Sequence, residues 1–450
     1  MSKVIKIKKG LNISLLGTAE KIMKKADQAD FYAIKPTDFV GIRPKLVVKV
    51  GDKVKAGTPL FFDKFQPEVQ FTSPVSGEIV EINRGERRAI LEVVVKADKT
   101  IEYEEFKVGD PKNLSKEEIV EALQKSGLWP SLRQRPYSTI ANPNDTPKAI
   151  FISAFDSAPL APDMDYIVKD CVECFQKGID VLSKLTNGKI HLNLNADYPP
   201  ADTFTKAKGV ELNYFTGPHP SGNVGIQINK IDPINKGDII WYTYPQEVAA
   251  IGRFFEKGIY DATKIVALTG SEVKNPKYFK VLNGASVKNL VKNNVNDGEL
   301  RYISGNVLTG SKIEDDGYIG FYDNQITVIP EGKYHDFFGW ATPGFKKYTA
   351  SRTLLSWLIP GKKYRLDTNF HGGHRAYVMT GEYEKVFPMD IYPVQLIKAI
   401  MIEDIDKMEQ LGIYEVDEED FALCEYVCTS KTEVQSIIRN GLDLMRKEMS

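Results

Sequence analysis

The sequence predicts a multidomain protein of mixed α/β (α+β) class, and three observations support this prediction. A β-rich segment with many Gly and Pro turns lies near the N-terminus, strand patterns then alternate with helical patterns, and a helical pattern dominates the C-terminal part. The chain has 450 residues, 42% of them hydrophobic. That is enough for several cores, because a domain takes about 100 to 200 residues. We expect four domains, over residues 1–100, 113–258, 259–329 and 330–450.

Residues 51–88 carry the clearest local pattern in the chain. Gly and Pro place turns at 51–52, 57–59, 73–74 and 76–77, because Gly adopts positive φ and Pro presets φ. Between these turns, stretches rich in β-branched and aromatic residues predict short strands. These strands are expected at 60–62, 69–71 and 79–82.

This layout resembles the half-barrel of biotinyl and lipoyl carrier domains, so we expect a biotinyl/lipoyl-like barrel-sandwich domain over residues 1–100. A carrier domain presents a modifiable Lys at a hairpin tip. Counted back from Pro74, that position is Gln66, and the nearest lysine, Lys64, lies outside the expected tip. The pattern therefore predicts the carrier shape without the modified Lys.

Neighbouring segments are expected to complete the first domain. Strand-like stretches lead into the half-barrel and close it, at 5–10, 39–41, 44–48 and 90–95. Residues 18–36 are polar and end at Pro36, which is more typical of an exposed excursion than of a core. A charged connector over 97–112 follows.

Residues 115–257 alternate strand and helix patterns, which predicts βαβ units and a mostly parallel, Rossmann-like sheet. Ser115 and Glu118 form the sequence signature of a capping box, and Gly127 ends the helix that they start. Further elements are expected as strands at 149–154, 190–194, 211–215 and 237–244, and as helices at 163–185 and 245–257.

Residues 259–329 are expected to form a small β-grasp (SLBB-like) domain, because short strand patterns alternate there with Gly and Asn turns. The strands are expected at 264–268, 278–281, 300–303, 318–321 and 325–328. Residues 330–450 are expected to be helical, with a helix over 393–410 and a second over 433–447. Apolar residues at helical spacing define one buried face of the first helix: Leu396, Ile397, Ile400, Met401, Ile405 and Met408.

Charge and hydropathy exclude several classes of partner. Lys and Arg number 59 against 60 Asp and Glu, a net charge of -1, which gives no reason to expect nucleic acid and fits poorly with a polybasic anchor. No run approaches the roughly 18 to 20 apolar residues of a membrane-spanning helix. The N-terminus lacks the apolar region and cleavage site of a signal peptide, so we expect the chain to remain in the cytoplasm.

The four cysteines form two pairs, which are too few for a disulfide framework in a chain of this length. Cys171 and Cys174 have the spacing of zinc or iron-sulfur ligands but lie inside a helical pattern without a companion pair. Cys424 and Cys428 are also short of the four cysteines of a ferredoxin run, and Thr429 stands where such a run has Pro. Buried structural thiols are favoured, and a four-thiolate site requires both pairs to meet in the fold.

Histidines occur in two Gly-rich loops, and no nucleotide fingerprint of either the G-x-G-x-x-G or the G-x-x-x-x-G-K-[ST] type is present. The loop over 217–225, with His219 and Gly222, can present backbone N–H groups to an anion or a carbonyl, or can be a tight turn with a surface His. His371 and His374 have no carboxylate at ligand spacing, which favours a turn or an interface over a metal site.

The stretch 129–137 interleaves aromatic residues with arginine, in the order Trp129, Arg133, Arg135 and Tyr137. Such residues can stack on a planar ring and donate hydrogen bonds to its oxygens. The same residue types are enriched at protein interfaces. Ligand contact, interface and ordinary packing all stay open here.

Nine stretches together resemble the A subunit of the bacterial sodium-translocating NADH:quinone oxidoreductase family. They run in family order from Pro59 to Cys428: PLFFDK, FTSPVSGEIVEINRGERR, SGLWPSLRQRPYS, GPHPSGNVG, QEVAAIGRFFEKG, RYISGNVLTG, FFGWATPGF, FHGGHRAYVMTGEYEKVFPMDIYP and DFALCEYVC. The chain is also similar to the C subunit of the Rnf complex, but it lacks the ferredoxin-type cysteines and the nucleotide-binding domain of that relative.

The resemblance implies a peripheral subunit on the cytoplasmic face of the bacterial inner membrane, in a six-subunit translocase that passes electrons from NADH to quinone and exports Na⁺. It implies docking chiefly on the membrane-bound B subunit, with membrane association through partners only. FMN, riboflavin, FAD and iron-sulfur centres are expected in partner subunits, and no cofactor or metal in this chain. Quinone, either ubiquinone or menaquinone, is the expected substrate, and the isolated chain is not expected to be active alone.

The leading hypothesis is a contribution to the reduction of quinone to quinol. Arginine and His donors would stabilise negative charge on the reduced ring, and His219 would supply a proton, because an unperturbed His titrates near neutral pH. The expected quinone or interface contacts are Trp129, Arg133, Arg135, Tyr137, His219 and Gly222. The expected docking residues are Arg84, Arg87, Arg88, His371, His374 and Arg375. A purely structural docking role and an independent flavoenzyme or metal protein are the alternatives.

Overall fold

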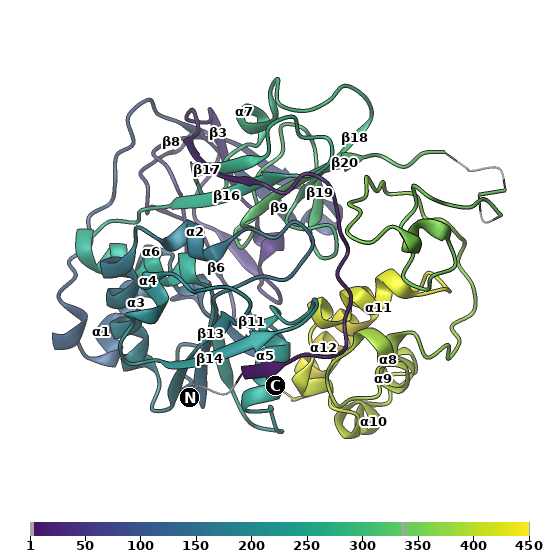
Figure 1. Ribbon diagram of the computed structural model, residues 1–450. Coiled ribbons are helices and arrows are strands. Elements are labelled where there is room, and N and C mark those ends of the chain that lie inside the picture. The colour runs from purple at the N-terminus through teal and green to yellow at the C-terminus, as the bar shows by residue number, and fades with distance from the viewer. Residues whose placement is uncertain (1–3, 335–337, 340, 450) are drawn as a thin grey trace.

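The computed structural model describes residues 4–334, 338–339 and 341–449. Within these residues the strands form sheets of seven, six, four and three strands. Figure 1 shows the sheets stacked through the centre of the molecule, with the C-terminal helices packed against one side. This arrangement confirms the predicted mixed α and β multidomain class.

The first domain is an antiparallel barrel-sandwich, as its turn pattern predicts. The turn between β6 and β7 contains Gln66 and leaves Lys64 exposed. Inside the barrel, the rings of Phe61 and Phe71 stack with centroids 4.6 Å apart. One sheet has the order β3 (Phe31–Ile34), β9 (Ile90–Ala97), β8 (Gly77–Arg84) and β5 (Lys53–Val54), and the other β4 (Pro44–Leu46), β6 (Pro59–Asp63) and β7 (Gln70–Thr72).

The N-terminal segment does not belong to the barrel alone, which differs from the expectation for residues 5–36. Strand β1 (Val4–Lys6) pairs with a strand of the second domain, and β2 (Glu20–Lys25) pairs with a strand of the third. In Figure 1 this purple segment runs from the bottom of the molecule to the top. The polar stretch also contains β3, whose Tyr32 is 2% exposed, so it contributes to the barrel core. Local sequence predicts strands, but it does not identify their partners.

The second domain is built on the seven-stranded sheet, and five of its strands are parallel. The order is β1, β14 (Glu211–Thr216), β13 (Lys189–Asn195), β12 (Ala149–Ser153), β15 (Ile240–Thr243), β10 (Arg133–Arg135) and β11 (Thr139–Ile140). Strand β10 is antiparallel to both of its neighbours, β15 and β11. Helix α1 (Lys116–Ser126) starts with the predicted capping box at Ser115 and ends at Gly127 in the left-handed conformation.

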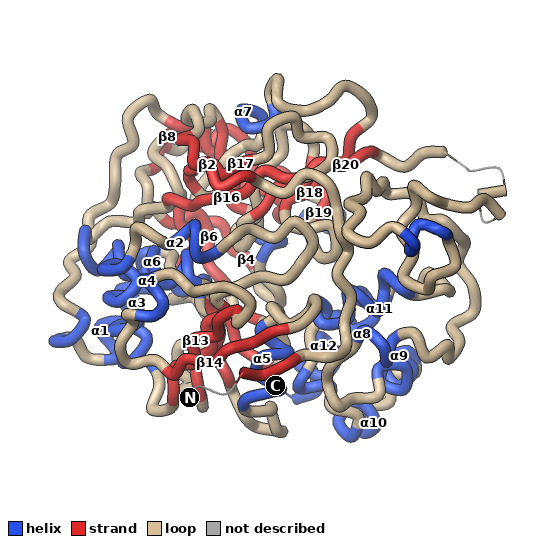
Figure 2. The backbone as a smooth tube through the Cα atoms, viewed as in Figure 1, coloured by secondary structure: helices blue, strands red, loops and turns tan. Residues whose placement is uncertain are grey.

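Both faces of this sheet are covered, because alternate residues of a strand point to opposite faces. Ile150 and Ile152 belong to the core that includes α3 (Val172–Leu185) and α6 (Pro245–Lys257). Ala149 and Phe151 belong to a second core with the C-terminal helices. Figure 2 shows the two groups of helices on opposite sides of the red strands. The remaining helices of the domain are α2 (Met164–Val168), α4 (Asp202–Thr205) and α5 (Val224–Ile231).

The single helix predicted over 163–185 is interrupted. Helices α2 and α3 are separate, and Cys171 between them has φ -115° and ψ 30°. The hydroxyl of Thr203, from α4, donates to the carbonyl of Val168 at 2.8 Å. A residue distant in sequence therefore satisfies a helix-end carbonyl, which the local periodicity cannot indicate.

The third domain contains a six-stranded mixed sheet, including the N-terminal strand β2. The predicted strand at 318–321 is wrong: the segment makes one isolated β-bridge, between Tyr318 and Ser286, and is otherwise irregular. The Phe321 N–H donates to Asp38 of the first domain at 2.8 Å. The strand order is β19 (Ser311–Ile313), β18 (Leu300–Ser304), β20 (Gln325–Pro330), β16 (Thr263–Thr269), β17 (Lys277–Leu282) and β2, with a short helix α7 (Lys288–Val291).

The α-helices of the C-terminal part begin at Tyr383, whereas the described residues of 331–382 are mostly irregular apart from a 3-10 turn at Leu355–Leu358. The helix predicted over 393–410 breaks at Glu403, which has φ 56°, and Met401 is 54% exposed rather than buried. Asp404 then caps the next helix by accepting from the Lys407 N–H. The helices are α8 (Tyr383–Val386), α9 (Pro393–Met401), α10 (Ile405–Gln410), α11 (Ala422–Val427) and α12 (Val434–Met449).

Among the described residues, no helix combines the length and the apolar character needed to cross a bilayer. The longest one, α12, buries one face against the second core and exposes the other. Its amphipathic pattern is that of a surface helix of a folded domain.

The crossing of α3 and α6 depends on Gly178 and Gly252, which gives a test of the fold. A Cβ on Gly252 would lie 1.7 Å from the Cys174 carbonyl oxygen, so the Gly252→Ala variant must push the helices apart. We expect this variant to lose about 1 to 3 kcal/mol of unfolding free energy in a urea titration. Gly373→Ala, at a site with open space around it, is the matched control and should lose less than about 0.5 kcal/mol. Equal losses would contradict the close helix contact.

Candidate functional site

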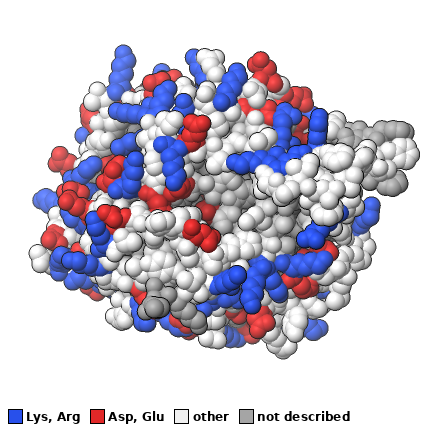
Figure 3. Space-filling view, in the orientation of Figure 1, with Lys and Arg blue, Asp and Glu red and all other residues white. Residues whose placement is uncertain are grey.

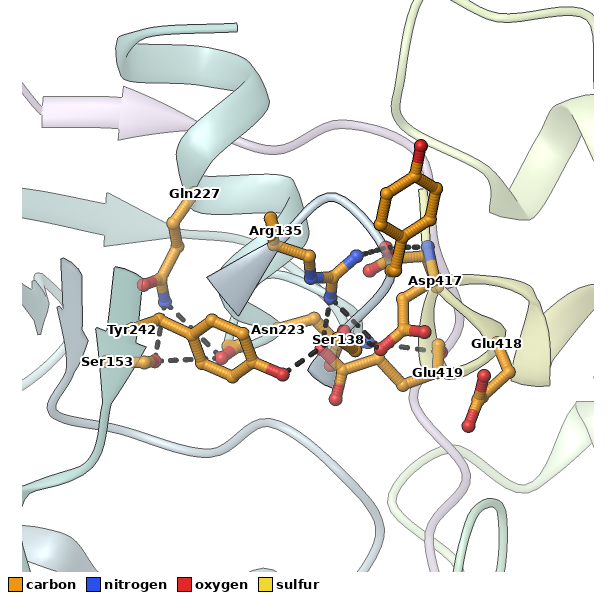
Figure 4. A network of polar contacts seen from close by, with 12 residues as sticks. Arg135, Ser138, Ser153, Asn223, Gln227, Tyr242, Asp417, Glu418 and Glu419 are labelled. Atoms are coloured by element: carbon orange, nitrogen blue, oxygen red, sulfur yellow. Dashed lines mark hydrogen bonds and ion pairs between the residues drawn. The ribbon is translucent and has the colours of Figure 1, made fainter. Parts of the chain in front are cut away.

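The candidate residues of the second domain lie in two loops that both meet the acidic segment Asp417–Asp420. One loop contains β10 and β11, and the other covers 217–225. Figure 4 shows how side chains from these loops and from the acidic segment converge in one polar network. The structure thus brings part of the predicted set together, with a partner that the sequence analysis did not single out.

Trp129 lies in the core below the first loop and is fully buried. Its ring packs edge-on against Trp241, with centroids 5.6 Å apart, and its Nε1 donates to the Ala141 carbonyl at 2.7 Å. Both the face and the polar atom of this indole are therefore occupied by the protein itself. Among ligand contact, interface and ordinary packing, this geometry favours packing for Trp129.

Arg133 lies among three tyrosine rings. Its guanidinium carbon is 4.6 Å from the ring centre of Tyr242, 5.5 Å from that of Tyr244 and 4.3 Å from that of Tyr322. Tyr322 comes from the third domain and donates its hydroxyl hydrogen to the Pro130 carbonyl at 2.7 Å. The arginine stacks on aromatic rings, as its residue type suggests, but these rings belong to the chain and join two domains.

Arg135 is fully buried, and its charge is neutralised by the acidic segment. Its Nη2 lies 2.9 Å from Glu419 Oε1 and 3.4 Å from Asp417 Oδ2, and its Nη1 lies 3.2 Å from Asp420 Oδ2. Arginine stays charged inside proteins, so its burial requires carboxylates at this distance. Strand β10 is therefore tied to the C-terminal segment by ion pairs.

A second arginine, Arg439 of α12, completes the cluster. Its Nη1 lies 3.0 Å from Glu418 Oε2 and donates to the Tyr137 carbonyl at 3.0 Å. Ser138 Oγ donates to Asp417 Oδ2 at 2.6 Å and accepts from the Tyr242 hydroxyl at 3.1 Å. Four carboxyl groups thus face two arginines, with hydroxyl groups between them. Figure 4 shows the Arg135 side of this cluster.

Burial decides which of these carboxyl groups hold a proton. It raises the pKa of Glu418 to about 8, that of Glu419 to about 7 and that of Asp420 to about 6. Burial also opposes ionisation of Asp417, but Arg135 and Arg439 outweigh it and lower the pKa of that carboxyl. At neutral pH the cluster therefore retains protons, which brings its charge close to balance.

Tyr137 lies at the edge of a cavity of about 230 Å³ between three parts of the chain. Gly41 and Phe65 line it from the first domain, Gln134 from β10, and Arg446 from α12. Burial, followed by the charge of Glu409, raises the pKa of the Tyr137 hydroxyl, so the phenol remains a hydrogen-bond donor at neutral pH. The other lining residues are Val40, Ile42, Asp63, Gln66, Thr139, Ile140, Asn142 and Met449.

This cavity includes the turn at which a carrier domain presents its modified Lys. Gln66 occupies the corresponding position and lines the cavity, whereas Lys64 on the same turn is exposed. The turn therefore contributes a wall to a site shared with β10 and α12.

His219 is buried, 4% exposed, in the second loop. Its Nδ1 lies 3.0 Å from Ser157 Oγ, and that hydroxyl also accepts from the Gly222 N–H at 2.8 Å. Since Gly222 donates to the hydroxyl, the serine hydrogen is available to donate to Nδ1. Burial lowers the pKa of His219 to about 4, so its imidazole is neutral at neutral pH. The expectation that His219 titrates near neutral pH is therefore wrong.

Gly222 is required by the close approach of this loop to its neighbour, because a Cβ there would lie 2.5 Å from the Ser157 backbone nitrogen. Its carbonyl accepts from Ser153 Oγ at 2.9 Å, and Gln227 Nε2 donates to the same Ser153 Oγ at 2.8 Å. The next residue, Asn223, donates to the Glu419 carbonyl at 3.2 Å. The second loop thus contacts the acidic segment directly.

The three expected docking arginines of the first domain lie at the β8–β9 hairpin. Arg84, Arg87 and Arg88 are all exposed, and none makes an ion pair with another described residue. Arg84 Nη1 donates to the Arg88 carbonyl at 3.0 Å, which shapes the turn. Three exposed cations on one hairpin are available to a partner, and their docking role stays a prediction.

The second expected docking group, His371, His374 and Arg375, lies in an exposed loop. His371 Nε2 is 3.8 Å from Asp367 Oδ1, and the His374 ring is 5.0 Å from that of Phe370. Within the described chain, no three His, Cys, Asp or Glu side chains gather in a way that could hold a metal ion.

The cysteine pairs lie apart. Cys171 and Cys174 are partly exposed at the start of α3, and Cys424 and Cys428 are buried at α11. Figure 1 shows these two helices on opposite sides of the molecule. A four-thiolate site joining both pairs is therefore not formed.

The sequence analysis missed the acidic segment and the tyrosines around Arg133. The signal for the first was available, since Asp417–Asp420 is a run of four acids in the sequence. The tyrosines had no local signal, because Tyr242, Tyr244 and Tyr322 meet only through the sheet and the domain contact.

Family models match three parts of the chain. The model described as the NqrA N-terminal barrel-sandwich hybrid domain matches residues 5–98, that of the NqrA second alpha/beta domain residues 114–260, and that of the NQRA C-terminal domain residues 265–315. These ranges cover the barrel, the seven-stranded sheet and part of the third domain.

Curated relatives match over the whole chain. Proteins named as the A subunit of the Na(+)-translocating NADH-quinone reductase, from Pasteurella multocida (strain Pm70), Yersinia pestis bv. Antiqua (strain Angola) and Neisseria meningitidis serogroup A, are 39%, 38% and 40% identical. Each alignment covers 99% of this chain and 100% of the relative. A solved NAD⁺-reducing [NiFe]-hydrogenase chain is 11% identical over 76% of this chain and 62% of its own, with a TM-score of 0.41, too low to carry an argument.

The ion pairs of Arg135 predict a large effect on stability. Arg135→Ala leaves buried carboxylates without their cation, so we expect a loss of about 3 to 5 kcal/mol of unfolding free energy in a urea titration. The control Arg84→Ala removes an exposed arginine without an ion pair and should change stability by less than about 0.5 kcal/mol. A loss below about 1 kcal/mol for Arg135→Ala would show that the cluster is not a tie between segments.

The raised pKa values of Glu418 and Glu419 predict that stability falls as pH rises. Their folded pKa values, about 8 and about 7, lie above those of an unfolded Glu, so the folded chain binds more protons between about pH 4.5 and 8. The stability that they contribute is present at the acidic end of this window and is lost as pH passes 7 to 8.

We expect the unfolding free energy to fall by about 3 to 4 kcal/mol between pH 6 and pH 9, measured by urea titration at each pH. The double variant Glu418→Gln with Glu419→Gln should flatten this dependence, whereas Glu117→Gln, on the exposed start of α1, should leave it unchanged. An unchanged slope in the double variant would refute the assignment.

Proposed function

This chain belongs to the family of A subunits of the Na(+)-translocating NADH-quinone reductase, and from that membership we propose that it contributes to the reduction of quinone to quinol. In this proposal it is a peripheral subunit on the cytoplasmic face of the bacterial inner membrane, docked chiefly on the membrane-bound B subunit of a six-subunit complex. Quinone reduction is coupled to Na⁺ export by the complex as a whole.

The observation that carries the quinone proposal is the cavity beside Tyr137. Its volume of about 230 Å³ is below the range of about 300 to 1,000 Å³ for sites that enclose a drug-sized ligand, so it suits a head group rather than a whole isoprenoid quinone. The Tyr137 hydroxyl and the Gln134 amide offer donors for carbonyl oxygens. Arg446 adds a positive charge, which would stabilise negative charge on a reduced ring.

The other candidate residues take supporting roles in this proposal. Arg133 and Arg135 flank Gln134 on β10, and this strand pairs with β15. Arg439 donates a hydrogen bond to the Tyr137 carbonyl. His219, neutral and buried, positions the second loop rather than supplying a proton. Proton supply to a reduced quinone at this site would come from solvent through the open side of the cavity.

We also propose that the chain has no redox centre of its own, and that FMN, riboflavin, FAD and iron-sulfur centres belong to partner subunits. The positions of the thiols support this, because each place holds two cysteines and a cluster of the ferredoxin type needs four. An absorbance spectrum and metal analysis of the purified chain test it: visible absorbance with bound iron would overturn it.

A second candidate function is a purely structural docking role without quinone contact. It is favoured by the internal engagement of Arg133, Arg135 and His219, whose polar atoms or faces meet the chain itself. On this reading the Arg133→Ala variant would impair assembly of the complex and leave its quinone affinity unchanged.

Tyr137 gives the test that separates the two functions. In the assembled complex, Tyr137→Phe removes one donor from the cavity, so we expect the quinone Kd to rise about three- to tenfold, the value of one neutral hydrogen bond. Tyr392→Phe, at a tyrosine that is 69% exposed, is the matched control. A photoreactive quinone should label peptides around Tyr137 or Phe65. Labelling confined to other subunits, with an unchanged Kd in Tyr137→Phe, would remove the quinone role and leave the docking function.

A further inference from the structure

The described residues 341–366 form a loop region with an apolar tip that no other part of the described chain covers. It lies at the right-hand edge of Figure 1, away from the sheets. Five of its large apolar side chains are exposed by roughly half: Phe345 50%, Leu355 42%, Trp357 48%, Leu358 54% and Ile359 46%. Monomeric proteins scatter exposed apolar residues singly, so a group of five on one loop calls for a partner.

The inward side of this region is well anchored. Tyr364 is 7% exposed, and its backbone exchanges hydrogen bonds with Ser14 and Leu16 at 2.8 and 2.9 Å. The Tyr348 ring packs edge-on against Tyr364, with centroids 5.4 Å apart, and Tyr348 also contacts Tyr426 of α11. Other residues make the contact with the body of the protein, and about half of the surface of each of the five apolar side chains stays exposed on a region with a fixed base.

The charge of the region has one sign. Residues 338–366 contain no Asp or Glu, and six Lys or Arg. Arg365 is paired with Glu272 at 2.7 Å. Four of the other cations make no ion pair with any described residue: Lys346, Arg352, Lys362 and Lys363. In Figure 3 uncharged residues dominate the corresponding side of the molecule, and Lys and Arg border them.

We propose that the tip over 345–363 inserts into the water interface of a membrane that contains anionic lipid. Apolar side chains next to unpaired cations, with a Trp among them, are the pattern of interfacial binding: the apolar groups enter the acyl boundary, Trp lies at head-group depth, and the cations meet lipid phosphates. The long Lys and Arg stems allow their charges to stay at the surface while the tip is buried.

The composition favours lipid over a docked protein. Protein interface cores are depleted in Lys, and a protein partner for this tip would need a pocket with several carboxylates around it. An anionic bilayer supplies negative charge on every side of a protruding tip. This contact revises the expectation that the chain meets the membrane through partner subunits only, and it does not depend on quinone binding.

Vesicle binding by the full chain tests the proposal. We expect the purified chain to sediment with vesicles of phosphatidylcholine and phosphatidylglycerol at 70:30, at least about tenfold more tightly than with phosphatidylcholine alone, and to be released by 0.5 M salt. The emission of Trp357 should shift to shorter wavelength on binding, and Trp357→Phe should remove that part of the shift.

Two variants separate the apolar and the charged contributions. Leu358→Ser with Ile359→Ser, and Lys346→Glu with Lys363→Glu, should each weaken binding to the anionic vesicles at least about tenfold. The matched controls are Ile402→Ser, at an isoleucine that is 68% exposed elsewhere, and Lys49→Glu in the barrel; neither should change binding. All these residues are exposed, and unchanged thermal unfolding would verify that the variants fold.

Two outcomes would overturn the proposal. One is equal binding, or no binding, to neutral and anionic vesicles. The other is a tip variant that binds vesicles as the parent does but no longer co-purifies with the partner subunits, which would make the tip a protein-docking surface. Neither outcome bears on the quinone titration with Tyr137→Phe, so failure here leaves the proposed function intact.

Discussion

The buried charge of Arg135 is the constraint on which the rest of the structure depends. A guanidinium with no exposed surface is tolerated only where carboxylates meet it, and Asp417, Glu419 and Asp420 do so from a segment about 280 residues away in sequence. That requirement places the acidic segment against β10. The start of α5 leaves room for Asp420 because residue 225 is a glycine: a Cβ there would lie only 2.5 Å from Asp420 Oδ2. The C-terminal helices then close the second face of the seven-stranded sheet.

The cavity beside Tyr137 and the tip over 345–363 both contact the C-terminal helices, which the ion cluster around Arg135 positions. Helix α12 carries Arg439 into the cluster and, two turns later, Arg446 to the wall of the cavity, where its Nη1 donates to the Gly41 carbonyl at 3.2 Å. The barrel, β10 and α12 enclose the cavity only because α12 is held there. On the other side, α11 offers Tyr426 to Tyr348, at the base of the apolar tip. One ion cluster therefore sets the geometry of both.

The residue types that suggested ligand binding are largely used within the chain. Arginine and aromatic side chains at 129–137 do stack and form ion pairs, but with Tyr242, Tyr322 and the acidic segment. Arginine and aromatic side chains can bind a ligand or join two domains through the same stacking and ion-pair contacts. The sequence does not distinguish these cases, because they differ only in whether the chain itself supplies the group that is contacted. What remains open to a ligand is the edge of this region, where Tyr137 lies. The carrier-like turn, without its Lys, becomes part of that edge.

Sequence alone determined the features that depend on local chemistry. The barrel turns, the capping box at Ser115, the strands of the parallel sheet and the helix over 245–257 were all predictable, since Gly, Pro, capping residues and periodicity act over a few residues. Family membership could also be inferred from motifs spread along the chain.

Only the tertiary structure decided what depends on distant partners. It assigned the N-terminal strands to two later sheets, broke the helices predicted over 163–185 and 393–410, and lowered the pKa of His219 by burial. It also paired Arg135 with the acidic segment and left the tip over 345–363 uncovered by the described chain. Each of these outcomes is set by packing between segments far apart in the chain, and neither propensity nor spacing within one segment contains that information.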